Sequence, residues 1–194
     1  MIVDSHLLIS QILYKYLFNQ MNFKLNRVSF AFGNIKPDFI NKDINRSHTL
    51  YQSLYCFNKY SEELMNRNVS IKEFSMYLGV TCHFACDYFC IYHREGNDKK
   101  NIFEHLFYEL VLHVKLITLL LKGEINLNKC KVTENSVEAI VMRLQESYNS
   151  EPRNLTRDIT YALFAASQIS KLIVCRGKGY EAQGAVSKTL KTAV

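Results

Sequence analysis

The sequence predicts an all-α fold, a single-domain bundle of several helices. Only 7 glycines and 2 prolines occur among 194 residues, so long stretches lack the residues that interrupt helices. Apolar residues recur every three or four positions through most of the chain, and no segment alternates apolar and polar residues as a strand does. A domain of this length can bury roughly 70% of the surface of its unfolded chain, which is enough for a self-sufficient core.

The first helix is expected to begin at Asp4 or Ser5, because both residue types cap helix amino termini well. Its apolar positions fall at helical spacing: Leu7, Leu8, Ile12, Leu13, Tyr16 and Leu17. A loop is expected over residues 33–38, where a glycine and a proline lie close together. A second helix opens at Asn45 or Ser47 and runs to about residue 66.

Four further helices are predicted in the rest of the chain. A Ser-x-x-Glu capping box at residues 70–73 opens one that runs to about residue 92. The next covers about residues 100–122 and ends at Gly123, a common residue after a helix. The last two cover about residues 134–148 and 152–175, and the second starts at a proline, which is favoured in a first helical turn.

This pattern divides the chain into one helical domain, residues 1–175, and a basic C-terminal tail, residues 176–194. The net charge of +6 fits a solvated surface and also attraction to an anionic partner. No secretory signal is evident, and no apolar run approaches the ~20 residues that cross a bilayer. We therefore expect a cytoplasmic protein without a transmembrane segment.

Six cysteines occur in the chain, and in a reducing compartment they should be free thiols. Cys82, Cys86 and Cys90 repeat every four residues, so on a helix they form one stripe. No Cys-x-x-Cys pair is present. We interpret the three as small core residues.

Histidines and carboxylates form an ordered series that predicts a multinuclear zinc site. Its members are His6, Asp38, His48, His83, Asp87, His93, His105 and Glu109. Two pairs, His83-x3-Asp87 and His105-x3-Glu109, place their Cβ atoms about 5–6 Å apart on one helix face, so each pair can bind one ion. Imidazole and carboxylate are the ligands of hydrolytic zinc sites. His113 continues the second stripe, and we expect it to support a ligand or the core.

The series resembles the bacterial zinc-dependent phospholipase C family over about residues 5–112. The shared order is a histidine, Gly-x-x-x-Pro-Asp, a histidine, His-x3-Asp, a histidine and His-x3-Glu. The resemblance implies a helix bundle of the zinc-dependent phospholipase C type, with zinc in a cleft and cleavage of the glycerol–phosphate bond of phospholipids. A related fold and cluster are found in fungal single-strand-specific zinc nucleases, so the metal site alone does not name the substrate.

The resemblance also implies roles for individual residues. One zinc site would be His48, His83 and Asp87, the second His93, His105 and Glu109, and part of a third His6 with Asp87 bridging. Asp38 matches the catalytic aspartate, and Phe39 lies where an aromatic residue would contact the substrate headgroup. Family members complete the third site with an amino-terminal tryptophan, a residue type that this chain lacks. The cofactor is therefore two or three zinc ions, with the amine of Met1 as the available substitute ligand.

The expected function is a zinc-dependent phosphodiester hydrolase in which metal-activated water attacks a phospholipid-like substrate. One alternative is a zinc nuclease acting on single-stranded nucleic acid, which is the less favoured partner. A second alternative is a non-catalytic binding protein that retains the metal site. The oligomeric state is left open.

Overall fold

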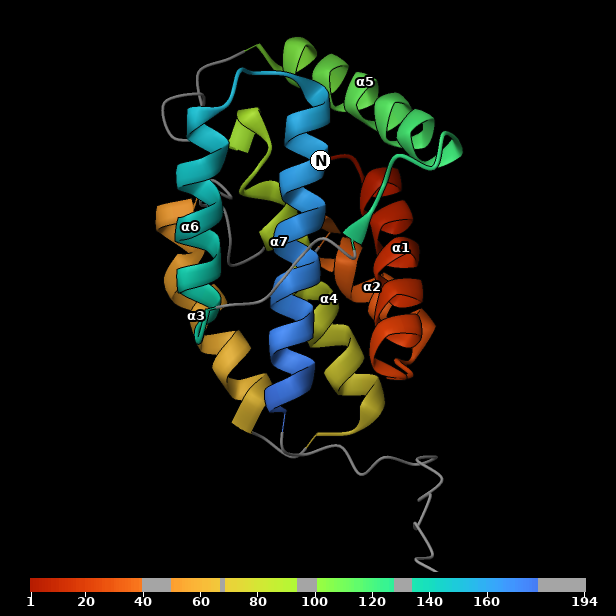
Figure 1. The fold of residues 1–194 in the computed structure, drawn as a ribbon, viewed down its shortest axis with the longest axis vertical. Coiled ribbons are helices and arrows are strands. Elements are labelled where there is room, and N and C mark those ends of the chain that lie inside the picture. Colours follow the sequence, from red (N-terminus) through yellow and green to blue (C-terminus); the bar gives the residue numbers. More distant parts are fainter. Residues whose placement is uncertain (40–49, 67–68, 94–100, 128–133, 178–194) are drawn as a thin grey trace, which may run out of the picture.

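The computed structural model describes residues 1–39, 50–66, 69–93, 101–127 and 134–177, and the elements formed in these ranges are helices (Figure 1). In order they are α1 (Val3–Met21), α2 (Arg27–Phe39), α3 (Leu50–Asn66), α4 (Ile71–Asp87), the 3-10 turn η1 (Ile91–His93), α5 (Ile102–Leu121), α6 (Val137–Ser150) and α7 (Leu155–Arg176). No strand occurs within the described ranges. The predicted all-α fold is confirmed.

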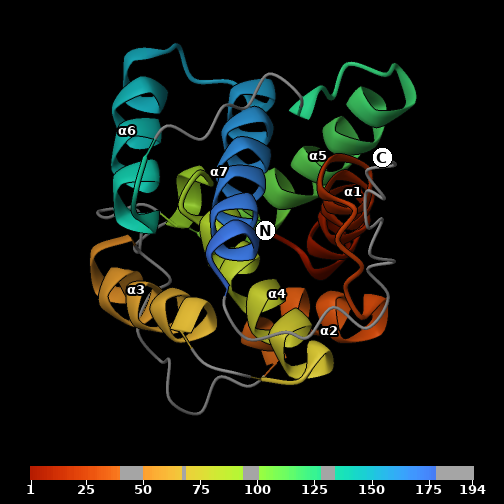
Figure 2. The ribbon, with the colours of Figure 1, turned by 60° about the horizontal axis from the view of Figure 1, so that its bottom comes forward.

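Helices α4 and α7 pack against each other and form the centre of the bundle. Helices α1 and α2 lie on one side of this pair and α3 and α6 on the other, while α5 crosses one end (Figures 1 and 2). Because α7 is surrounded, its apolar side chains are almost fully covered, and Ala162, Ala166, Ile169 and Ile173 have no exposed surface. The ends of α1 and α4 that face α5 enclose the histidine cluster.

The loop predicted over residues 33–38 is wrong, because α2 continues through it. Gly33 lies against α4, where a Cβ atom would overlap the carbonyl oxygen of Met76, and a Cβ atom on Gly79 would overlap that of Phe30. The two glycines thus let the backbones of α2 and α4 touch, so here glycine serves helix packing instead of a turn. Pro37 falls in the last turn of α2 and is buried.

The predicted helix starts are confirmed in part. Ser70 accepts a hydrogen bond from the backbone N–H of Glu73 at 3.2 Å, as the capping box requires. Helix α1 instead begins at Val3 after Ile2, without a side-chain cap, so the predicted cap at Asp4 or Ser5 is wrong. Ser5 is buried and contacts α5 instead. The predicted start at residues 45–47 lies outside the described residues, as does the tail from residue 178.

A buried polar network ties α5 and α6 to α7. Asp158 on α7 is 3% exposed and accepts hydrogen bonds from the Tyr148 hydroxyl at 2.7 Å and the Arg157 guanidinium at 3.0 Å. Its other carboxylate oxygen accepts a hydrogen bond from the Tyr108 hydroxyl on α5. Tyr108 precedes Glu109, so this network fixes the helix that presents two of the predicted zinc ligands, His105 and Glu109.

One face of α5 is apolar and exposed. We call it the α5 apolar face, and it comprises Ile102, Phe103, Leu106, Phe107, Leu110, Val114, Ile117, Leu120 and Leu121. Phe103 and Phe107 are 76% and 68% exposed, and exposed apolar side chains gathered on one helix face are typical of a contact site. Among the described helices none has the length and apolar character needed to cross a membrane.

Candidate metal centre

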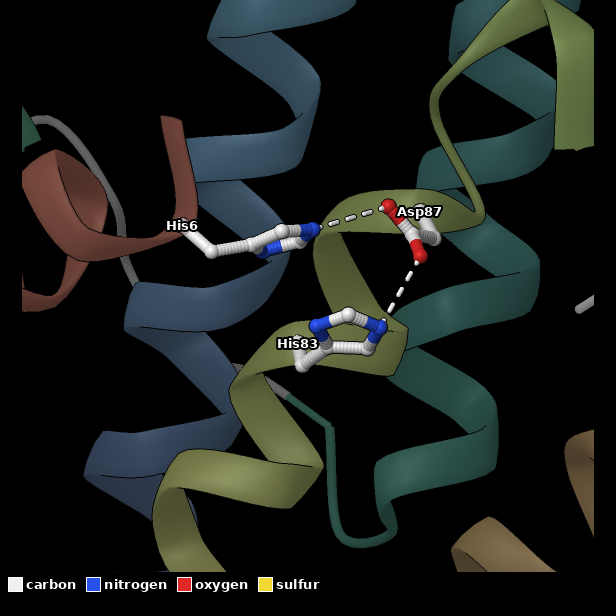
Figure 3. A group of neighbouring side chains, drawn as sticks. All are labelled: His6, His83 and Asp87. Atoms are coloured by element: carbon white, nitrogen blue, oxygen red, sulfur yellow. Dashed lines mark ion pairs between the residues drawn. The ribbon is translucent and has the colours of Figure 1, made fainter. Parts of the chain in front are cut away.

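His6 on α1 faces His83 and Asp87 on α4, and the three side chains converge (Figure 3). The Asp87 carboxylate lies between the two rings, with Oδ1 3.3 Å from Nε2 of His6 and Oδ2 3.2 Å from Nε2 of His83. The rings themselves stack with centroids 4.0 Å apart. All three side chains are 1% exposed or less. Asp87 therefore has one oxygen for each of two neighbouring positions.

The orientation of His83 suits a metal ligand. Its Nδ1 lies 2.8 Å from the carbonyl oxygen of Asn34, to which an Nδ1–H group donates, and its Nε2 is directed towards Asp87. A backbone carbonyl that holds the second nitrogen of a histidine is the usual partner of a metal-bound ring. Nε2 of His83 and Oδ2 of Asp87, 3.2 Å apart, are two donor atoms that face each other and could bind one cation.

The environment of His6 also suits a metal ligand. It is fully buried, and its Nδ1 has no hydrogen-bond partner among the described residues. Burial, assisted by the neighbouring charge of His83, lowers the pKa of His6 to about 3, so the ring is neutral near pH 7. A buried, neutral imidazole with one nitrogen directed at a carboxylate and the other unpaired fits a zinc ligand.

A second group lies beside the first, formed by Cys90, His93 and Glu109, whose ligand atoms all lie within 4.8 Å of one another. Nε2 of His93 lies 3.2 Å from Oε1 of Glu109, and Nε2 of His105 lies 2.9 Å from the same oxygen. The ring of Tyr92 stacks on His105 with centroids 4.8 Å apart and fixes its plane. This group joins the end of α4 to α5.

The amino group of Met1 lies between the two groups. It contacts Oδ1 of Asp87 at 2.8 Å, Oε1 of Glu109 at 3.0 Å and Nε2 of His93 at 3.2 Å. Burial alone would lower the pKa of this amine, but the Asp87 carboxylate raises it to about 12. A positive charge thus occupies the space that both carboxylates face, which is the charge arrangement of a cation site.

The positively charged groups nearby lower the pKa values of the Asp87 and Glu109 carboxyls. Burial alone would raise the pKa of Asp87, but the charges of His93 and the Met1 amine hold it well below its usual range. Burial likewise opposes ionisation of Glu109, and hydrogen bonds from His93 and the amine lower its pKa to about 2. His93 is disfavoured as a cation by burial, yet Asp87 raises its pKa to about 10. Metal binding would therefore release protons from this cluster.

Asp38 lies at the edge of the first group, where α2 ends. Its Oδ1 is 3.7 Å from Nε2 of His83, and its side chain is 25% exposed. Burial raises the pKa of Asp38. Phe39, the next residue, is 66% exposed. Asp38 thus lies beside the cluster, as the sequence analysis expects, although on a helix and not in a loop.

Of the predicted ligands, the structure gathers His6, His83, Asp87, His93, His105 and Glu109, while His48 lies outside the described residues. His113 is not among the gathered ligands, and its Nδ1 lies 3.0 Å from the hydroxyl of Ser5, next to His6. Cys90 is the member that the sequence analysis missed, because it was assigned to a core stripe. The Cys90-x-x-His93 spacing was the available signal.

Helices that direct histidines and carboxylates into one buried cluster define a class of metal-binding helical proteins. This chain belongs to the zinc-dependent phospholipase C family, whose family model matches residues 5–155. The match covers more than half of the chain and extends past the region that the motif order had suggested. Searches of curated proteins and of solved structures found no match.

Proposed function

We propose that this protein is a zinc-dependent phosphodiester hydrolase acting on phospholipid-like substrates. The observation that supports it most is the convergence of His6, His83 and Asp87 at the boundary of α1 and α4, in a chain of the zinc-dependent phospholipase C family. All three side chains are buried, and Nδ1 of His6 has no hydrogen-bond partner among the described residues, which is costly unless an ion or another group satisfies it. Asp38 stands beside them where a catalytic carboxylate is needed.

We assign the proposed ligands to individual zinc ions from the two groups of side chains described above. His83 and Asp87, with His48, would hold one ion, and His93, His105 and Glu109 a second. His6 would share Asp87 with a third ion, for which the amine of Met1 is within reach of the same carboxylate. Zinc supplies, when bound, activation of water near neutral pH and neutralisation of the charge on a phosphodiester.

Asp38 is proposed as the general base. A carboxyl whose pKa is raised by burial is a stronger proton acceptor than an exposed one, and 3.7 Å from His83 it lies at the border of the cluster. Its partial exposure leaves room for a water molecule and a substrate oxygen. Asp38 would orient that water and accept its proton as the oxygen attacks phosphorus. Phe39, exposed beside it, is the proposed contact for the substrate headgroup.

The α5 apolar face favours a lipid over a nucleic acid. Phe103, Leu106 and Phe107 flank His105 on α5 and are more than half exposed, so apolar surface borders the second group. No lysine or arginine occurs on α5 before Lys115. Single-stranded nucleic acid needs a basic groove for its phosphates. Acyl chains need apolar surface, and this helix supplies it.

The test compares substrates on the zinc-loaded protein. We expect hydrolysis of phosphatidylcholine, both as vesicles and as a soluble short-chain form, and little cleavage of a single-stranded oligonucleotide. Phe107→Glu should lower the rate on vesicles at least tenfold while leaving the rate on the soluble lipid unchanged. Val28→Glu is the matched control, because Val28 is 79% exposed on α2 and should tolerate the charge. Oligonucleotide cleavage without lipid hydrolysis would instead identify a nuclease.

A further inference from the structure

Cys90 differs from the two cysteines that precede it in sequence. The thiols of Cys82 and Cys86 lie 4.0 and 3.8 Å from the carbonyl oxygens of Ala166 and Ala162 on α7, so each has a partner in the core. Cys90 is also fully buried, but its sulfur lies with a ring nitrogen of His93 and a carboxylate oxygen of Glu109. It belongs to the metal-ligand cluster and not to the α4–α7 contact.

The backbone explains why the Cys90 side chain points away from α7, unlike those of Cys82 and Cys86. Helix α4 ends at Asp87, and the N–H of Cys90 donates to the carbonyl oxygen of Asp87 at 2.9 Å in a tight turn. The carbonyl oxygen of Cys90 in turn accepts from the N–H of His93 at 3.0 Å. The four-residue helical repeat is therefore broken before Cys90. The turn aims its thiol at the position that His93 and Glu109 share.

We propose that Cys90 is a protein ligand of the ion held by His93, His105 and Glu109, bound as a thiolate. This proposal rests on the proposed function, because it concerns one of the ions named there. Sulfur, nitrogen and oxygen donors within 4.8 Å of one another can meet around one zinc ion, whose bonds are about 2.0–2.3 Å long. Thiolate, two imidazoles and one carboxylate make a complete tetrahedral set.

With four protein ligands around the ion at Cys90, the two metal-ligand groups would have different roles, one structural and one catalytic. Zinc with four protein ligands is a closed, structural site, whereas a catalytic ion keeps one position for water. The open position would then belong to the ion of His83 and Asp87, which is the group that Asp38 borders. The ion at Cys90 would join the end of α4 to α5 and hold the rest of the centre in place. A thiolate also favours zinc or cobalt over magnesium and calcium.

The test uses cobalt(II), which occupies zinc sites and reports sulfur ligation by an intense near-ultraviolet charge-transfer band. Full-length protein is stripped of metal, loaded with cobalt and quantified for bound metal. We expect the band in the unmodified protein and its loss in Cys90→Ala, with at least one cobalt retained and a weaker affinity for the other. Cys86→Ala is the matched control and should keep the band. Zinc X-ray absorption should show one sulfur at about 2.3 Å, absent from Cys90→Ala.

The outcomes separate this proposal from the proposed function. Cobalt or zinc bound in full amount without a sulfur signal would overturn the role of Cys90 and leave the metal centre intact. A sulfur signal that survives in Cys90→Ala but disappears in Cys86→Ala would overturn it as well. Protein that binds no metal at all would overturn both. Far-ultraviolet circular dichroism of both variants confirms that they are folded.

Discussion

Nδ1 of His83 lies 2.8 Å from the carbonyl oxygen of Asn34, so a backbone atom of α2 orients a proposed ligand on α4. Asn34 follows Gly33, which packs against the backbone of α4. The close approach of α2 to α4 thus brings the Asn34 carbonyl to the ring of His83 and sets the orientation of that ring. Without that approach the carbonyl could not reach the ring, and Nε2 would lose its fixed direction towards Asp87.

Gly33→Ala should therefore disturb both stability and the metal centre. A methyl group at this position meets the carbonyl oxygen of Met76, a backbone atom that cannot turn aside. We expect the free energy of unfolding to fall by about 1–3 kcal/mol, as for other overpacked sites, and zinc affinity to fall with it. Urea unfolding and metal titration measure the two effects. Val28→Ala, an exposed change on the same helix, should alter neither, and a Gly33→Ala protein with unchanged zinc affinity would refute the coupling.

Asp38→Asn should lower the rate of phosphodiester hydrolysis by roughly 10²–10⁴-fold, because an amide cannot accept the proton of the attacking water. Zinc content should stay the same, since Asp38 borders the cluster at 3.7 Å from His83 and is not a proposed ligand. Steady-state kinetics and elemental analysis of the same preparation check both statements. Lys36→Gln on the same helix serves as the control. Unchanged activity in Asp38→Asn would remove Asp38 from the mechanism.

The metal-free protein should lose stability as the pH falls from 6.5 towards 3. The pKa of His6 is about 3 in the folded state and 6.5 in the unfolded chain, so between these values unfolding takes up a proton. The stabilisation is present above pH 6.5 and is lost as the pH falls through this window. Urea unfolding at pH 6.5 and 4.5 tests it. His6→Phe should reduce the difference between the two pH values, while His113→Phe should preserve it, and an equal difference in both variants would contradict the assignment.

Asp158→Ala should destabilise the fold by about 3–5 kcal/mol. The change leaves the guanidinium of Arg157, which is 5% exposed, without its carboxylate, and breaking a buried pair from one side is costly. Tyr108→Phe removes one hydrogen bond and should cost only about 1 kcal/mol. Denaturant unfolding compares the two with Glu146→Ala, an exposed control on α6. Equal losses for Asp158→Ala and the control would show that the network contributes nothing.

The sequence predicted the parts of the site that depend on helix periodicity alone. His83 and Asp87, like His105 and Glu109, lie four residues apart on one helix, so their proximity required no knowledge of the partner helices. The order of the remaining ligands identified the family, which the match over residues 5–155 confirms. The division into domain and tail and the cytoplasmic location stay predictions.

The wrong structural predictions have one physical origin. At each position, contact with a neighbouring helix or turn gives the residue a different role from the one that its local sequence indicates. Gly33 was interpreted as a helix breaker, but contact with α4 requires a residue without a side chain there. Ser5 was interpreted as a cap, but α1 starts two residues earlier and the hydroxyl contacts His113 instead. Cys90 was assigned to a core stripe, but the helix ends at Asp87 and turns its thiol towards His93. Each outcome depends on a neighbouring element that the local pattern does not contain.

If this cluster binds zinc, the purified protein should contain the metal, and its metal content is therefore the first measurement to make. Elemental mass spectrometry of protein prepared without chelator should be run beside His83→Ala and His105→Ala, one variant for each group. We expect two or three zinc ions per chain and a lower number in both variants. Folded protein without stoichiometric metal would contradict zinc binding by this cluster, and with it the proposed hydrolase.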